Sequence, residues 1–362
     1  MEAIKELTPF AAWGLDGRRP LVIAGPCSAE TEEQVMNTAI RLKQTPTQVF
    51  RAGIWKPRTR PNSFEGVGVK GLKWLKQVRE ETGLLTTTEV ANAQHTYEAL
   101  KYGVDMLWIG ARTTVNPFTI QEIAEALSGV DIPVFVKNPV NPDVELWIGS
   151  IERLQKVGIS RVAAVHRGFS SFSENRYRNA PNWQIPIELK RLRPDLPLIC
   201  DPSHIAGKRN LLLEISQKAM DLNFDGLMVE THPDPDSAWS DAKQQITPEE
   251  LGEMLNHIIL RKVDPGSNGF LHQLEALRGE IDRLDQELLS LLEDRMKVAA
   301  RIGMVKKENQ VTILQPARWD QIISKYLEVG NAKGLSEEFI RKLFMAIHQE
   351  SINTQTKVMN DI

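Results

Sequence analysis

The chain has 362 residues, 25% of them charged, and a formal net charge of −3 at neutral pH. It offers no cationic excess for a nucleic acid or an anionic membrane, and no apolar run is long enough to span a bilayer. With only two cysteines and no apolar segment near its start, we expect a cytoplasmic protein without a disulfide framework, large enough for a barrel-sized domain and a smaller one.

Short apolar segments alternate with charged, amphipathic segments between residues 21 and 260. Most of the apolar segments are too hydrophobic for half-exposed strands, which favours a parallel sheet covered by helices. Eight strand–helix units over about 240 residues predict an α/β fold, a (β/α)8 TIM barrel. A doubly wound open sheet is the alternative, although no glycine-rich dinucleotide loop follows the first strand. The predicted strands are 21–24, 49–51, 84–86, 106–109, 134–136, 161–165, 198–200 and 226–229, and the predicted helices include 32–43, 69–81, 143–157 and 210–222.

A charged or metal-binding side chain follows each predicted strand, where barrel enzymes build their active sites. One set combines a thiol, an imidazole and two carboxylates, from Cys27, His204, Glu230 and Asp241. Such donors suit a divalent ion of the Mn, Fe, Co or Zn type better than calcium or magnesium. Taken singly, each has an ordinary structural explanation, such as a buried cysteine or a helix-capping acid. Their joint position at one barrel mouth predicts a metal site.

A second set at the strand ends is cationic, and its members would repel one another unless anions lay between them. Guanidinium groups suit phosphate and carboxylate oxygens. The set therefore predicts a substrate with phosphate and carboxylate groups, whereas a surface ion pair is the commoner role for any single member. It comprises Arg51, Lys56, Arg58, Arg112, Lys137 and Arg167.

Five motifs occur in order along the predicted barrel: Gly25-Pro-Cys-Ser28, Lys56-Pro-Arg-Thr59, Gly110-Ala-Arg-Thr113, Asp201-Pro-Ser-His204 and Glu230-x-His232. Together they resemble 3-deoxy-D-arabino-heptulosonate 7-phosphate (DAHP) synthase, of the short type related to 3-deoxy-octulosonate 8-phosphate synthase. The resemblance implies condensation of phosphoenolpyruvate with D-erythrose 4-phosphate to DAHP and phosphate, on the route to chorismate. It also implies one divalent metal ion and no organic cofactor.

The resemblance assigns roles to individual positions. It implies that Cys27, His204, Glu230 and Asp241 bind the metal. Lys56 is implied as a proton donor to the developing alkoxide. The implied phosphoenolpyruvate clamp is Arg112, Lys137 and Arg167, with Arg51 and Lys56 closing the same site, and the implied aldose-phosphate residues are Arg58 and Thr59.

Two other activities fit a barrel of this kind. A relative that uses arabinose 5-phosphate is the close alternative, but Lys56-Pro-Arg-Thr59 favours the four-carbon aldose. A metal hydrolase would be expected to carry a His-x-His pair on the first strand, and no histidine lies between Ala24 and Cys27.

The chain beyond the barrel is predicted to be helical. We divide the sequence into a barrel domain at 1–262, a linker at 263–270 that is rich in turn formers, and a helical domain at 271–362. Apolar residues spaced alternately three and four apart predict a long helix over 271–306. That helix would be about 54 Å long, more than a domain of this size can cover alone, so we expect a homodimer through the helical domain.

Arg295 interrupts this apolar seam where a leucine would be expected. A buried arginine needs an anionic partner. Two interpretations stand: a structural ion pair with a residue such as Glu350, or a clamp for a substrate carboxylate.

The spacing of Leu277, Arg278, Arg295 and later polar residues resembles the all-helical chorismate mutase, which rearranges chorismate to prephenate. The resemblance implies that Arg278 enters the partner's site and, with Arg295, binds the two carboxylates of chorismate. It implies that Lys306 and Gln355 bond the ether oxygen, whose negative charge grows in the transition state. Assisting roles are implied for Arg318 and Ser351.

Two positions depart from that family's pattern. Gln315 and Trp319 stand where the family usually has an acid and a glutamate that hold the hydroxyl and carboxylate region of the substrate. The alternative to a mutase is a sensor domain that binds chorismate or prephenate without useful turnover. In either case we expect a ligand in the helical domain to shift a conformational equilibrium and inhibit the condensation reaction, with prephenate or chorismate as the inhibitor.

Overall fold

The structure is a computed structural model that describes residues 5–15, 19–57, 64–171, 176–262, 268–313 and 316–360. The chain divides into two compact units, Met1–Val263 and Asp264–Ile362. We describe each unit by itself.

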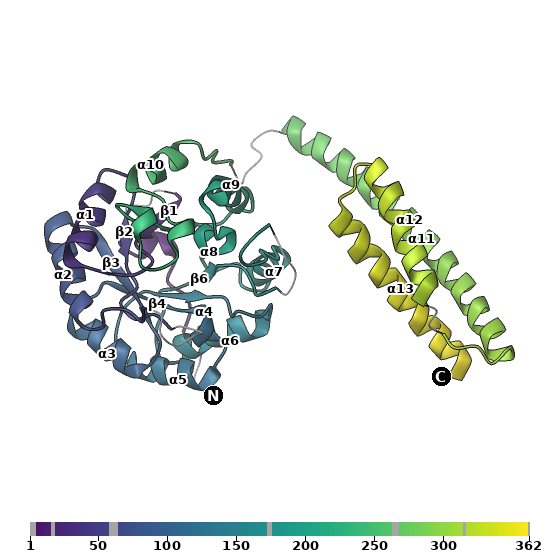
Figure 1. The fold of residues 1–362 in the computed structure, drawn as a ribbon, viewed down its shortest axis with the longest axis horizontal. Coiled ribbons are helices and arrows are strands. Elements are labelled where there is room, and N and C mark those ends of the chain that lie inside the picture. The colour runs from purple at the N-terminus through teal and green to yellow at the C-terminus, as the bar shows by residue number, and fades with distance from the viewer. Residues whose placement is uncertain are drawn as a thin grey trace. The chain divides into compact units, whose positions relative to one another are not determined.

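The first unit is a closed barrel of eight parallel strands in which each strand pairs with the next and β8 pairs with β1 (Figure 1). The predicted TIM barrel is confirmed, and the open sheet is wrong. One boundary differs in a way that matters for the site: β3 includes Thr88 and Glu89, which we expected beyond its end. The strands are β1 (Leu21–Gly25), β2 (Val49–Arg51), β3 (Leu85–Val90), β4 (Met106–Ile109), β5 (Val134–Lys137), β6 (Val162–His166), β7 (Leu198–Cys200) and β8 (Gly226–Glu230).

Helices cover the outside of this barrel, and polar side chains set where several of them begin. The Asp143 carboxylate accepts a hydrogen bond from the Leu146 amide, which makes it the cap of α6 rather than its first residue. The helices are α1 (Glu32–Leu42), α2 (Lys70–Thr82), α3 (Ala93–Lys101), α4 (Ala111–Thr114), α5 (Pro117–Ala126), α6 (Val144–Lys156), α7 (Gln184–Leu192), α8 (Pro202–Ala206), α9 (Leu212–Asp221) and α10 (Pro248–Asn256). Short 3-10 turns are η1 (Phe10–Ala12), η2 (Arg209–Leu211), η3 (Pro235–Ser237) and η4 (Ala242–Gln244).

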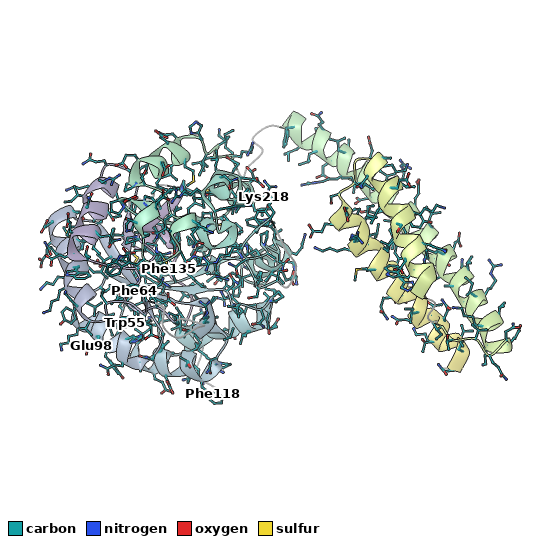
Figure 2. The ribbon with its side chains drawn as sticks, viewed as in Figure 1. Trp55, Phe64, Glu98, Phe118, Phe135 and Lys218 are labelled. Atoms are coloured by element: carbon teal, nitrogen blue, oxygen red, sulfur yellow. The ribbon has the colours of Figure 1, made fainter. Side chains whose placement is uncertain are left out.

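Side chains alternate between the two faces of each strand and fill two apolar layers. Ile23 and Phe135 lie in the layer inside the barrel, whereas Val22 packs between the strands and the helices. Trp13 belongs to the inner layer, and its ring centroid lies 6.0 Å from that of Phe135. In contrast to the enclosed Phe135, the ring of Phe118 is 82% exposed on α5 (Figure 2).

The second unit is helical, as predicted, with α11 (Asn268–Glu308), α12 (Pro316–Ala332) and α13 (Glu337–Asn360). α13 packs against both other helices. Much of the α11 seam stays open, since Leu277, Ile281 and Leu291 are 51%, 57% and 68% exposed. Among the described residues, no helix combines the length and hydrophobicity that crossing a membrane requires.

Candidate active site

A close approach of two backbones positions the first side chains of the barrel site. A Cβ atom at Gly25 would lie 2.0 Å from the Arg51 carbonyl oxygen, so only glycine lets β1 and β2 meet there. Just beyond Gly25, Cys27 is fully buried. The Lys56 ammonium donates to the Cys27 carbonyl at 2.8 Å and to its sulfur at 3.1 Å. The loops that follow β1 and β2 are therefore joined at the barrel mouth.

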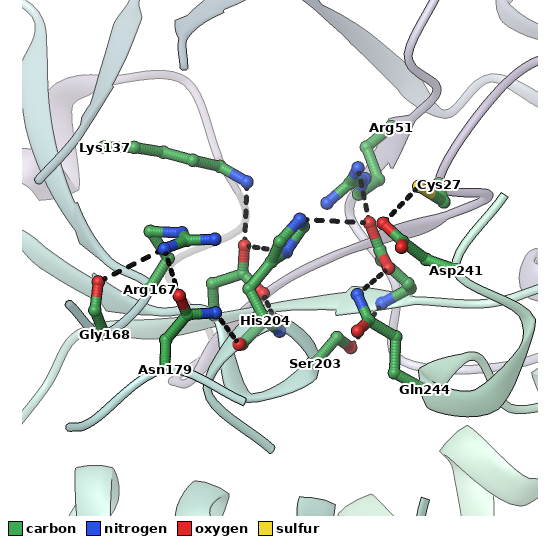
Figure 3. Close-up of polar contacts among 12 residues, drawn as sticks. Cys27, Arg51, Lys137, Arg167, Gly168, Asn179, Ser203, His204, Asp241 and Gln244 are labelled. Atoms are coloured by element: carbon green, nitrogen blue, oxygen red, sulfur yellow. Dashed lines mark hydrogen bonds and ion pairs between the residues drawn. The ribbon is translucent and has the colours of Figure 1, made fainter. Parts of the chain in front are cut away.

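Three of the four predicted metal ligands converge at this mouth. One ligand atom each from Cys27, Glu230 and Asp241 can be chosen so that all lie within 4.8 Å of one another. The Cys27 sulfur lies 3.3 Å from Asp241 Oδ2, and the two side chains meet beside Arg51 in Figure 3. His204 adjoins the group, because its Nε2 lies 3.7 Å from Glu230 Oε1. Cys27, Glu230 and Asp241 therefore offer sulfur and oxygen donors to one point, and His204 places a nitrogen donor beside Glu230.

The charges around this set fit a divalent cation. Burial raises the pKa of the Cys27 thiol to about 12, and the nearby Glu230 carboxylate adds to the rise, so without a metal the thiol keeps its proton. Burial alone would raise the pKa of Glu230, but His204 and Arg51 outweigh it and the pKa is lowered. Two carboxylates and a thiol that ionises only beside strong positive charge suit a borderline divalent ion. The residues present therefore fit the implied metal.

Asp201 connects the metal-ligand candidates to the cationic set. Its Oδ2 lies 2.7 Å from the Lys137 ammonium and 2.8 Å from His204 Nδ1, while its Oδ1 accepts a hydrogen bond from the His204 amide at 3.1 Å. Asp201 is fully buried. Burial opposes its ionisation, yet the charges of His204 and Lys137 hold its pKa well below the usual range. This carboxylate orients an imidazole and neutralises a lysine at the same time.

Two buried guanidinium groups at the mouth have unused capacity for an anion. Arg51 is 1% exposed and bonds Glu230 at 3.2 Å, but its Nε and Nη1 have no partner in the described part of the chain. Arg167 donates to the amide oxygen of Asn179 at 2.8 Å and pairs with no carboxylate among the described residues (Figure 3). Burial lowers the pKa of Arg167 to about 10, which leaves it charged at neutral pH.

The remaining predicted barrel residues are placed less fully. Arg58 and Thr59 lie outside the described residues. Arg112 lies on α4 with its side chain exposed, unlike the buried Lys137 and Arg167 of the same predicted clamp.

Three further residues of the mouth had no role predicted from sequence, although Glu89 was expected just beyond the third strand. Glu89 accepts a hydrogen bond from the Trp108 indole at 3.1 Å, and Gln244 donates to Glu230 Oε2 at 2.6 Å. Arg178 bonds Asp241 Oδ1 at 2.9 Å. Glu89 was detectable, since it follows Leu85 and Thr87 at the strand period of two. No local pattern marks the other two residues.

The helical unit contains a second site, a cavity of about 380 Å³ between its helices. Its lining includes four of the six predicted mutase residues. The lining residues are Arg295, Val298, Ala299, Ile302, Lys306, Ile313, Trp319, Ile322, His348, Ser351, Ile352 and Gln355.

Hydrogen bonds within this cavity favour one of the two interpretations of Arg295. Its Nη1 donates to the Ser351 hydroxyl, and no ion pair joins it to Glu350 or to another acid of the described helices. Lys306 donates to the Ile313 carbonyl. The Gln355 amide oxygen is buried without a partner in the described helices. An uncompensated guanidinium and an unmet amide are the groups that a polar, anionic ligand would satisfy.

The other predicted residues of the helical unit lie elsewhere. Arg278 is exposed on α11, away from the cavity lining, and pairs with Glu275 at 2.8 Å. Gln315 and the side chain of Arg318 fall outside the described parts of the chain.

Comparisons with known proteins match a different family in each of the two units. Residues 12–262 match the DAHP synthetase I family, and residues 277–356 match the chorismate mutase type II family. Among curated proteins, the phospho-2-dehydro-3-deoxyheptonate aldolase of Thermotoga maritima is 32% identical over 237 residues, which is 66% of this chain and 68% of the relative. A 2-dehydro-3-deoxyphosphooctonate aldolase of Nitratidesulfovibrio vulgaris is 26% identical over 274 residues, covering 69% and 95%.

Solved structures resemble the chain over a similar extent. The crystal structure of the Thermotoga maritima phospho-2-dehydro-3-deoxyheptonate aldolase aligns with a TM-score of 0.59 and 33% identity, over 65% of this chain and 67% of that one. A truncated form of 3-deoxy-D-arabino-heptulosonate 7-phosphate synthase from the same organism aligns with a TM-score of 0.60 and 29% identity, covering 69% and 90%.

Proposed function

The chain belongs to the DAHP synthetase I family and carries a type II chorismate mutase domain after its barrel, and from this premise we propose a metal-dependent synthase whose helical domain regulates it. The proposed reactions are condensation of phosphoenolpyruvate with D-erythrose 4-phosphate and rearrangement of chorismate to prephenate. We propose the cytoplasm as its location and the division at 1–262, 263–270 and 271–362 as its domain plan.

One observation carries the synthase proposal: buried N–H groups of Arg51, without a partner among the described residues, lie beside the converging donors of Cys27, Glu230 and Asp241. Buried cations with unmet hydrogen bonds favour an anionic ligand. A metal-ligand set at the same mouth suits a carbonyl-containing co-substrate. An enzyme that joins an enol phosphate to an aldehyde needs both features in one place.

Each residue of the mouth has a proposed task. Lys137, Arg167 and Arg112 hold the carboxylate and phosphate of phosphoenolpyruvate, with Arg51 and Lys56 closing the site. Cys27, His204, Glu230 and Asp241 would hold a Mn, Fe, Co or Zn type ion, which when bound polarises the aldehyde carbonyl as a Lewis acid. Arg58 and Thr59 are proposed for the aldose phosphate.

The condensation forms one carbon–carbon bond and breaks one carbon–oxygen bond. The enol carbon of phosphoenolpyruvate attacks the aldehyde carbon, and Lys56 donates a proton to the resulting alkoxide. Burial opposes the charge on Lys56, but the Cys27 and Glu230 side chains outweigh it and raise its pKa, so the proton is present at neutral pH. Water adds to the former enol phosphate carbon, and phosphate leaves with its bridging oxygen, so that this carbon becomes the ketone of the product. Of the two water protons, one leaves with phosphate and the other replaces the proton that Lys56 gave.

The test is an assay of purified protein with phosphoenolpyruvate and either erythrose 4-phosphate or arabinose 5-phosphate, with and without a chelator. We expect turnover of the four-carbon aldose, lost on chelation and restored by added divalent metal. Preference for the five-carbon aldose would replace the substrate proposal, and undiminished turnover in metal-stripped enzyme would remove the metal proposal.

For the helical domain, we propose that Arg295 binds a chorismate carboxylate while Lys306 and Gln355 bond the ether oxygen, with Ser351 and Arg318 assisting. The Gln355 oxygen, which has no partner in the described part of the helical unit, supports this assignment. A sensor without turnover is the second candidate, favoured by Trp319 at a position that is usually acidic. Chorismate consumption by the full chain distinguishes the two.

We further propose a homodimer through α11. Leu277, Ile281 and Leu291 form an uncovered apolar face that a second copy of the same helix would bury. Arg278 lies on the same stretch of α11, and we propose that it enters the partner's cavity. Sedimentation of the full chain and of a truncation ending at Lys262 tests the dimer. The same two proteins test feedback: prephenate or chorismate should inhibit condensation by the full chain only, and equal responses would contradict regulation.

A further inference from the structure

His348 is a polar residue of the helical cavity outside the set proposed to bind the carboxylates and ether oxygen of chorismate. It lies on α13 with Ser351 and Gln355, at spacings of three and seven that place all of them on one helix face. Its imidazole stacks on the Trp319 indole of α12, with ring centroids 4.2 Å apart and planes inclined by 22°. The stack holds the imidazole in one orientation at the wall of the cavity.

The other polar groups of the cavity suit the charged and ether oxygens of a ligand. Arg295 and Lys306 supply positive charge from α11, and Gln355 supplies an amide. The Ser351 hydroxyl is already engaged, since it accepts from Arg295 and donates to the Ile347 carbonyl. The cavity lining, as far as the structure describes it, contains no carboxylate.

We propose that His348, held by Trp319, is the specificity-determining residue that recognises the hydroxyl group of chorismate. This inference rests on the proposed mutase function. Chorismate carries two carboxylates, an ether oxygen and one ring hydroxyl, and the hydroxyl both donates and accepts a hydrogen bond. A neutral imidazole offers one donor and one acceptor, whereas the Trp319 indole offers a donor only.

The charge state of His348 agrees with this role. Burial and the neighbouring charges of Arg295 and Lys306 lower its pKa, so the ring is neutral near pH 7. A neutral ring adds no third positive charge to the clamp. Neither ring nitrogen of His348 is hydrogen-bonded within the described helices, so both are available to a ligand.

The experiment uses the full chain and two variants, His348→Phe and His348→Asn. Phenylalanine keeps a ring stacked on Trp319 but removes both nitrogens, and asparagine keeps a neutral donor and acceptor. For each protein we would measure KM and kcat for chorismate, and the inhibition constant of the chorismate analogue in which hydrogen replaces the ring hydroxyl.

Loss of one uncharged hydrogen bond weakens binding by about three- to tenfold. We expect His348→Phe to raise the KM for chorismate by that factor, to leave the inhibition constant of the deoxy analogue within about twofold, and His348→Asn to restore part of the difference. Equal losses for both compounds, or no loss for either, would overturn the inference, because a packing role does not discriminate a hydroxyl. Absence of chorismate turnover in the unsubstituted protein would instead overturn the mutase proposal.

Discussion

Replacing Asp201 with asparagine removes one charge from the centre of the barrel mouth with little change of shape. An amide oxygen can still accept the bond from the His204 amide, now 3.1 Å long. The other oxygen, Asp201 Oδ2, lies 2.7 Å from Lys137 Nζ and 2.8 Å from His204 Nδ1. The substitution removes this negatively charged partner from both groups. Removing one partner of a buried pair costs roughly 3–5 kcal/mol. In the variant, the Lys137 ammonium can move toward the Trp108 ring, whose centroid is 5.7 Å away, or lose its proton, because burial already lowers its pKa. We therefore expect a loss of unfolding free energy at the lower end of that range, about 3 kcal/mol.

The same substitution should weaken metal binding by about 10–100-fold, because the carboxylate that orients the His204 ring is gone. Calorimetric titration of chelator-stripped protein with Mn²⁺, and urea unfolding in chelator, measure the two effects separately. Asp131→Asn is the matched control, since Asp131 is 83% exposed in its pair with Arg161 and should change stability by no more than about 1 kcal/mol. Unchanged metal affinity and stability in Asp201→Asn would refute this account of the mouth.

Three further changes test other parts of the chain. Cys27→Ala should abolish condensation even with added metal while leaving chorismate turnover intact; full synthase activity in metal-free buffer would contradict the metal proposal. Arg295→Leu completes the apolar seam, so stability should stay within about 1 kcal/mol of the parent or improve, while chorismate kcat/KM falls at least about 100-fold; a variant that unfolds, in a protein whose parent never binds chorismate, would favour a structural role. Burial lowers the pKa of His166 to about 3, and Arg167 adds to the shift, so the native state resists a proton that the unfolded chain takes up near its ordinary value of 6.5. Stability should therefore fall as pH drops below that value, by about 2 kcal/mol at pH 5, and His166→Phe should remove this share; identical changes in unfolding free energy between pH 7 and 5 in both proteins would show that His166 does not contribute.

The barrel was predictable because its signals are local. Each buried strand is an apolar run, and the side chain after it lies at a known end of a parallel barrel. That rule was sufficient to predict that Cys27 and Glu230 lie at the same barrel mouth. It failed at β3, where Thr86, Thr87 and Thr88 interrupt the apolar run, so Glu89 was expected outside the strand that contains it.

The residues that sequence reasoning missed depend on contacts between distant segments. A role in the turn before Pro202 is enough to account for Asp201 in the sequence. No neighbouring residue indicates that the Lys137 ammonium, at the end of another strand, lies beside its carboxylate. His348 shares a helix face with Ser351, which sequence shows, but its stack on Trp319 joins two helices. Pairings of this kind follow from the closed fold rather than from any window of sequence.

The hydrogen bond between the Cys27 thiol and Asp241 has a consequence for how the proposed metal would be taken up and released. A thiol with a pKa near 12 must give up its proton before its sulfur can bind an ion. Uptake of the metal is therefore also release of a proton to the buffer, and its heat should vary with the ionisation enthalpy of that buffer. Acidification favours the protonated, metal-free site. At a fixed metal concentration, metal occupancy should therefore fall as the pH falls.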